Sequence, residues 1–206
     1  MYMSLVEPVT DQVIKIPYLT PREKISLARG ERVQKQERNG VRGSGLVVLD
    51  VEAPIDEVFD TLTKFSMYQD MIPTVRSSNI LSETTSNGED NNVNTVAEFT
   101  LSRFKLKVNV VHRVYRKQRT VRFSLDNSRP NLVFNEAEGF WHVQEPSDRP
   151  EGWSRVYLKA NIVATMLLPP PVLDYAASRA LPRATKWIVP YFTSSSKTVN
   201  FVEDHY

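Results

Sequence analysis

The sequence predicts an α+β fold that combines an antiparallel sheet, a long C-terminal helix and a helical arm at the N-terminus. Three observations support this class. Seven segments between residues 45 and 166 have strand-like patterns, and turn-forming sequences separate them at the short intervals of an antiparallel sheet. After three consecutive prolines at 169–171, apolar residues recur with helical spacing. Before residue 43 the chain is polar, basic and helix-prone.

Residues 1–42 are predicted to form a basic, partly helical arm. Thr20, Pro21 and Glu23 have the pattern of a helix start, with a capping side chain, a proline at the first helical position and a carboxylate that reaches back to the cap. A polar helix is expected to follow, with Gly30 weakening its middle. The arm carries a formal charge of +3, whereas the whole chain carries +2. The rest of the chain is therefore close to neutral.

Glycines at positions 40, 43 and 45 lie where the arm meets the rest of the chain. A phosphate-binding loop is excluded, because a strand follows where such a loop needs a helix N-terminus. The run is interpreted as a flexible joint. This divides the chain into an arm, 1–42, and a ligand-binding domain, 43–206.

The predicted elements after the joint follow in order. A strand over 45–51 leads to a short helix that begins near Pro54 and has acidic residues in its first turn. A second short helix or turn ends at Pro73. In residues 105–116 apolar and polar side chains alternate, so one face of that strand is expected to be covered. Strands are predicted over 75–83, 95–104, 105–116, 120–125, 132–143 and 154–166.

The C-terminal helix is predicted to present one apolar face built largely from small side chains. This face comprises Leu173, Ala176, Ala177, Ala180, Leu181, Ala184, Ile188 and Phe192. Pro182 and Pro190 remove backbone donors from the hydrogen-bond ladder. The helix is therefore expected to kink, or to divide into consecutive helices that share the face.

Composition excludes several classes of protein. The chain has no cysteine, which rules out a disulfide framework, a thiolate metal site and a cysteine nucleophile. The small net charge argues against a dedicated nucleic-acid-binding protein. No apolar stretch approaches the roughly 20 residues that span a bilayer. We expect no cofactor, no specific nucleic-acid partner and a cytoplasmic protein, with the interior of a plastid or mitochondrion as the alternative if a transit segment has been removed.

Two parts of the chain resemble a known family. Residues 51–73 and 75–81, and later Gly139-Phe140-Trp141 with the segment 153–158, resemble the polyketide cyclase/dehydrase and coenzyme-Q-binding-protein-like group of the START/birch-pollen-allergen superfamily, SRPBCC. The resemblance covers about residues 43–192. It implies a helix-grip fold, in which a curved sheet wraps around the last helix. It also implies an internal cavity that holds lipids, quinones, pigments or polyketides.

The candidate ligand-binding residues are aromatic and aliphatic side chains of the sheet and the last helix, with Tyr68 placed at the entrance. They are Tyr68, Phe99, Val108, Val110, Phe123, Trp141, Leu173, Ala177 and Leu181. The strand phase that decides which of them point inward stays open.

Few groups suit catalysis. The three histidines lack metal-ligand spacing, so no metal site is expected. His112 lies on the apolar phase of its strand and is interpreted as a histidine whose hydrogen bonds are satisfied near a strand end, with a ligand contact or a general base as the alternative. Glu136 and Glu138 share a strand phase and are expected to be solvated or paired rather than to act as an acid–base pair. A basic stretch is expected to form a solvated outer face; it comprises Arg103, Arg113, Arg116, Lys117 and Arg119.

The favoured hypothesis is that the protein binds, sequesters or transports a hydrophobic small molecule without catalysis. Two alternatives stay open. A cyclase/dehydrase-type enzyme would use the same cavity, with His112 or a buried glutamate moving a proton. A regulatory or assembly protein would instead use the basic arm to contact a protein partner or a membrane surface.

Overall fold

The computed structural model describes residues 14–85, 92–101, 105–129, 131–166 and 181–199. Among them, the helices are α1 (Pro21–Ala28), α2 (Ile55–Leu62), α3 (Tyr68–Met71) and α5 (Ile188–Val199), with the 3₁₀ turn η1 (Phe65–Met67), and residues 181–185 are helical as well. The strands are β1 (Val33–Asn39), β2 (Arg42–Glu52), β3 (Val75–Thr85), β4 (Val93–Leu101), β5 (Leu106–Tyr115), β6 (Thr120–Leu125), β7 (Phe134–Gln144) and β8 (Trp153–Ala164).

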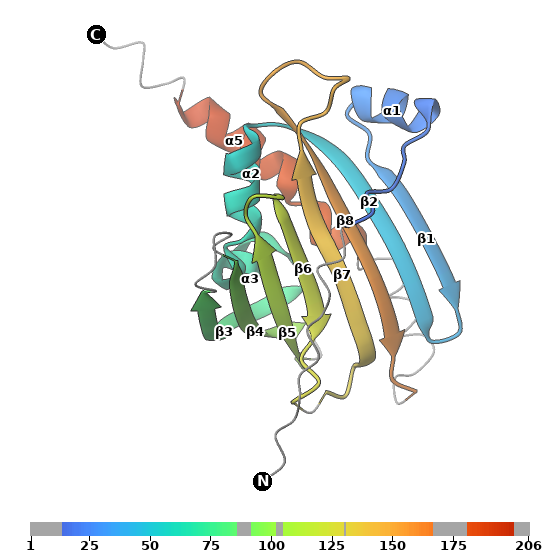
Figure 1. Ribbon diagram of the computed structural model, residues 1–206, viewed down its shortest axis with the longest axis vertical. Helices are drawn as coiled ribbons and strands as arrows, with labels where there is room; N and C mark the ends of the chain where they lie inside the picture. The colour runs from blue at the N-terminus through green and yellow to red at the C-terminus, as the bar shows by residue number, and fades with distance from the viewer. Residues whose placement is uncertain (1–13, 86–91, 102–104, 130, 167–180, 200–206) are drawn as a thin grey trace.

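The eight described strands form one antiparallel sheet in the order β1-β2-β8-β7-β6-β5-β4-β3. The sheet twists and curves, and α2, α3 and α5 lie together on one of its faces, the concave face (Figure 1). The main hydrophobic core lies between them, where Phe59 of α2 and Ile188 of α5 join apolar side chains of the sheet such as Val143. The predicted α+β, helix-grip class is therefore confirmed.

The seven predicted strands appear within a few residues of their expected bounds, but the arm differs from the prediction. Helix α1 ends at Ala28, and residues 33–39 form an edge strand that pairs with β2. Only the first residue of β1, Val33, is buried, so the strand carries no apolar alternation that sequence analysis could detect. The prediction of a longer helix, with Gly30 in its middle, was therefore wrong. The division of the chain into 1–42 and 43–206 stays a prediction.

The interpretation of the glycine run as a flexible joint was also wrong. Residues 39–42 form the tight turn of the β1–β2 hairpin, with Gly40 at a φ of +59°. A left-handed backbone conformation of this kind suits glycine, because a Cβ would be strained there. Gly43 and Gly45 are part of β2 itself. The segment is thus ordered by strand pairing on both sides.

A second hydrophobic cluster covers the opposite, outer face of the sheet. Leu27 of α1 is fully buried there, against Val48 of β2 and Tyr157 of β8. Because β2 is covered on both faces, residues 45–51 are all buried. This explains why residues 45–49 form a continuous apolar run rather than an alternation. The arm helix therefore belongs to the packing of the sheet; its contact with a partner or membrane stays a prediction.

Helix α1 is held at both ends. At its start the predicted capping box forms, since Thr20 Oγ1 accepts the backbone N–H of Glu23 at 3.3 Å and the Glu23 carboxylate accepts that of Thr20 at 2.8 Å. Lys35 of β1 binds the same carboxylate at 2.6 Å. At its end the guanidinium of Arg149 donates to the carbonyls of Leu27 and Ala28, at 2.6 and 3.1 Å. These contacts position the helix on the sheet.

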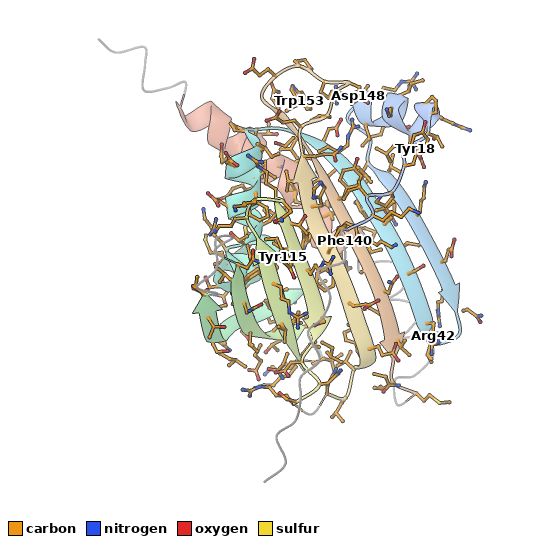
Figure 2. The ribbon with its side chains drawn as sticks, in the orientation of Figure 1. Tyr18, Arg42, Tyr115, Phe140, Asp148 and Trp153 are labelled. Carbon is orange, nitrogen blue, oxygen red and sulfur yellow. The ribbon has the colours of Figure 1, made fainter. Side chains whose placement is uncertain are left out.

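The same arginine belongs to a buried charge cluster. Asp50 of β2 accepts hydrogen bonds from Arg149 at 3.0 Å and from Arg155 of β8 at 2.7 and 2.8 Å. The Asp50 and Arg155 side chains are only 1% and 4% exposed. Arg149 also lies 4.2 Å above the ring of Trp153, a cation–π contact. Figure 2 shows Trp153 and Asp148 at the end of the sheet beside α1, with Arg42 at the opposite end.

The C-terminal segment divides where the prolines predict. Residues 181–185 are helical, a turn follows at 186–187, and α5 begins at Ile188. Pro190 is the third residue of α5, where a missing N–H leaves no hydrogen bond unmade. The predicted face residues Leu173, Ala176, Ala177 and Ala180 lie outside the described residues. Among the helices that the structure describes, none is both long and apolar enough to cross a bilayer.

Candidate ligand-binding cavity

A cavity of about 560 Å³ lies between the concave face of the sheet and the helical segments. Strands β4 to β8 supply most of its wall, α3 contributes Tyr68, and residues 181–184 contribute Leu181 and Ala184. Most of the side chains that line it are aromatic or aliphatic. Protein sites for small apolar molecules are commonly of this size and composition.

Seven of the nine predicted binding residues line this cavity. They are Tyr68, Phe99, Val108, Val110, Phe123, Trp141 and Leu181. The other two, Leu173 and Ala177, lie outside the described residues. That these side chains contact a ligand stays a prediction.

Tyr68 does not lie at an entrance, as the sequence suggested. Its side chain is buried, and its hydroxyl donates to the carbonyl of Leu62 at 2.7 Å. Burial raises the pKa of this phenol well above its usual value. The hydroxyl is therefore a neutral structural group, while the ring faces that of Phe99 at a centroid distance of 5.8 Å.

Strand register explains which side chains face the cavity. One row crosses the sheet from His112 through Phe123, Gly139 and Ala160 to Gly45. Four of the five residues line the cavity. The fifth, Gly139, lies beneath the ring of Phe123, which is one of the four. Side chains in the same row of an antiparallel sheet lie on the same face. Sequence analysis did not identify Ala160 and Gly45 as cavity residues, because their inward direction depends on pairing with distant strands.

The two glycines of this row leave room for larger neighbours. A Cβ on Gly139 would collide with the ring of Phe123 and with the carbonyl oxygen of Lys159. A Cβ on Gly45 would collide with the side chain of Leu181. Both large side chains therefore lie directly against the backbone of the sheet. Glycine at these positions shapes the cavity wall.

His112 forms part of the buried end of the cavity. The side chain is 4% exposed, and its ring stacks on that of Phe65 at a centroid distance of 4.0 Å. The ring of Phe99 meets it edge-on at 5.8 Å. Burial lowers the pKa of His112 to about 3, although a hydrogen bond to the backbone of Thr95 acts in the opposite direction. The imidazole is therefore neutral at physiological pH.

Acidification should destabilise the protein through His112. Below its ordinary pKa of 6.5 the unfolded chain takes up a proton that the folded ring does not bind until about pH 3, so stability present above pH 6.5 is lost as the pH falls. One such group changes the free energy of unfolding by about 1.4 kcal/mol per pH unit. Between pH 6.5 and 4.5 we expect the wild type to lose about 2–3 kcal/mol more than His112→Phe. Equal losses in urea unfolding would contradict the burial of this ring.

A second, polar hollow of about 720 Å³ adjoins the other end of the cavity, near Arg42 (Figure 2). The two share wall residues that include Ser44, Leu125 and Ile162. Glu136 and Glu138 line this hollow and are both exposed. As predicted, they are solvated and lack the low-dielectric setting that acid–base catalysis by paired carboxylates needs.

The structure adds partners to two members of the predicted basic stretch. In the turn between β5 and β6, Arg116 binds Asp60 at 3.0 Å and Arg119 binds Asp56 at 2.9 Å. These exposed ion pairs connect the turn to α2. Arg103 lies outside the described residues. Within the part of the chain that is described, no group of three or more histidine, aspartate and glutamate side chains is arranged to hold a metal ion.

Comparison with known proteins gives one family and many related folds. Residues 51–186 match the family described as polyketide cyclase / dehydrase and lipid transport. No curated protein sequence matches the chain.

Three solved structures illustrate the shared fold. A START superfamily protein from Mycobacterium smegmatis has a TM-score of 0.55 and 12% identity, and the match covers 79% of this chain and 97% of that one. The Zhui aromatase/cyclase from Streptomyces sp. R1128 has a TM-score of 0.53 and 12% identity, over 81% and 94% of the two chains. A STAR-related lipid transfer protein from Xanthomonas axonopodis has a TM-score of 0.55 and 12% identity, over 78% and 98%.

Proposed function

The chain belongs to the polyketide cyclase/dehydrase and lipid transport family, and we propose that it binds a hydrophobic small molecule in the cavity between sheet and helices, to carry or sequester it without catalysing a reaction. The observation that carries the proposal is the cavity itself, about 560 Å³ with a largely apolar and aromatic wall. A lipid, quinone, pigment or polyketide-like molecule fits this description.

The energetics support binding by burial alone. Removing apolar ligand surface from water gains about 25 cal/mol per Å². A ligand that buries about 400 Å² in the cavity therefore gains about 10 kcal/mol, from which an association cost of at least about 4 kcal/mol is subtracted. The remainder, at most about 6 kcal/mol, corresponds to a dissociation constant of about tens of micromolar or weaker, and a ligand that buries more apolar surface would bind more tightly. No catalytic group is needed for such a function.

The candidate catalytic residues, His112, Glu136 and Glu138, are poorly suited to proton transfer in the cavity. His112 has a pKa of about 3 because of its burial, so it is a weak base at neutral pH. Glu136 and Glu138 are exposed. Two of the compared structures are named for different activities, an aromatase/cyclase and a lipid transfer protein. The side chains that line this cavity favour binding and transfer of a ligand over catalysis.

Native mass spectrometry of the protein purified from its own cells tests the proposal. We expect a bound species whose mass excess disappears after extraction with organic solvent, and whose identity the extract then reveals. Saturable binding of the neutral fluorophore N-phenyl-1-naphthylamine, displaced by the extracted molecule, should follow. A protein that retains no molecule and does not bind the fluorophore would refute a binding function.

A further inference from the structure

We propose that the buried end of the cavity recognises a hydrogen-bond donor, such as a hydroxyl group, on an otherwise apolar ligand, and that His112 Nδ1 is the acceptor. The inference rests on the proposed function, because it requires a ligand in the cavity. It adds a polar requirement to a site that would otherwise select by shape alone.

The hydrogen bonds of the imidazole assign its tautomer. The backbone group of Thr95 that contacts the ring favours the protonated form, so it is an acceptor, the carbonyl oxygen. Nδ1 is buried and has no hydrogen-bond partner, so we assign the contact with the Thr95 backbone to the other ring nitrogen, Nε2. A neutral imidazole with its proton on Nε2 carries a lone pair on Nδ1. The ring therefore presents an unused acceptor.

Neither the described protein groups nor solvent satisfies this acceptor. Nδ1 is buried from water. The imidazole stacks on the ring of Phe65 and meets the ring of Phe99 edge-on, and neither ring offers a hydrogen-bond donor. The nearby phenol of Tyr68 already donates to the carbonyl of Leu62. A buried acceptor without a partner destabilises the state that contains it. A ligand that brings a donor would remove that cost on binding.

The His112 ring lies in the wall of the cavity. His112 is one of the cavity-lining residues and occupies the same row as Phe123, whose side chain also lines the wall. A donor reaches Nδ1 once the aromatic side chains beside it shift, so the hydrogen bond belongs to the bound state. An anionic group is excluded at this end, because the neutral ring cannot compensate a buried charge.

A matched pair of probes tests the inference. 2-Naphthol carries a donor, whereas 2-methoxynaphthalene has the same rings and an oxygen that only accepts. By isothermal titration calorimetry we expect the ratio of their dissociation constants to favour 2-naphthol about tenfold more in the wild type than in His112→Phe. His142→Phe is the control, because His142 lies outside the cavity wall and its Nδ1 already contacts Thr120 Oγ1 at 2.9 Å. Its ratio should equal that of the wild type.

A spectroscopic readout covers the case in which His112→Phe fails to fold. In the unsubstituted protein, the ¹⁵N resonance of His112 Nδ1 should move upfield with 2-naphthol and not with the ether. If both probes bind and neither the resonance nor the ratio changes, the donor site is wrong while the cavity function stands. If neither probe binds, the proposed function fails as well.

Discussion

Replacing Asp50 with alanine is expected to destabilise the protein by about 3–5 kcal/mol. The carboxylate compensates two guanidinium groups, those of Arg149 and Arg155, whose side chains are 13% and 4% exposed. Removing it leaves these cations buried with too few acceptors, although Arg155 keeps an ion pair with Asp148 at 2.8 Å. Urea unfolding at pH 7 measures the loss.

An exposed ion pair provides the matched control for this variant. Asp56 binds Arg119 at a similar distance, 2.9 Å, but its side chain is 77% exposed. Surface pairs of this kind contribute little, so Asp56→Ala should change stability by less than about 1 kcal/mol. If the two variants lose the same stability, the cluster around Asp50 does not behave as a buried one.

The charge cluster around Asp50 also connects helix α1 to the sheet. Arg149 binds Asp50 on one side and the last carbonyls of α1 on the other, at Leu27 and Ala28. Loss of Asp50 should therefore loosen α1 before the sheet unfolds. Hydrogen exchange of the α1 amides would rise more than that of β8 in Asp50→Ala.

Filling the cavity is the second change with a large expected effect. Val110 of β5 points into the cavity between Ala97 and Leu125, its partners in the neighbouring strands. An indole in its place occupies the space that a ligand needs. Val110→Trp should weaken the binding of N-phenyl-1-naphthylamine by about ten- to hundredfold, a loss of about 1.4–2.7 kcal/mol. Fluorescence titration measures it.

The adjacent residue supplies the control for cavity filling. Val111 belongs to the same strand but points to the opposite face, since side chains alternate along β5. Val111→Trp should bind the fluorophore as the wild type does. Equal weakening in both variants would place the fluorophore outside the cavity and count against the proposed function.

The elements and much of the candidate site followed from local sequence patterns. Turn residues separated the strands, prolines divided the C-terminal helix, and Thr20 with Glu23 located the start of α1. Period-2 alternation selected Val108 and Val110 for the cavity face, and both line the cavity. These predictions worked because capping and alternation depend on residues close in sequence.

Other features had no local pattern to reveal them. Strand β1 is polar and exists because its backbone pairs with β2. Asp50 meets Arg155 across 105 residues of chain, and the inward direction of Ala160 depends on register with β2 and β7. Tyr68 was placed at an entrance because its sequence neighbours do not reveal that its hydroxyl binds the carbonyl of Leu62.

By itself, the sequence determined the strands other than β1, most of the turns and the apolar character of the cavity wall. Only the tertiary structure decided which residues of distant strands share a row, which charge is buried, and that His112 Nδ1 is buried without a hydrogen-bond partner. The physical reason is the range of the interactions. Helix caps, turns and alternation are set by neighbours within a few residues, whereas burial and hydrogen-bond partners are set by chain segments that meet only in the folded state.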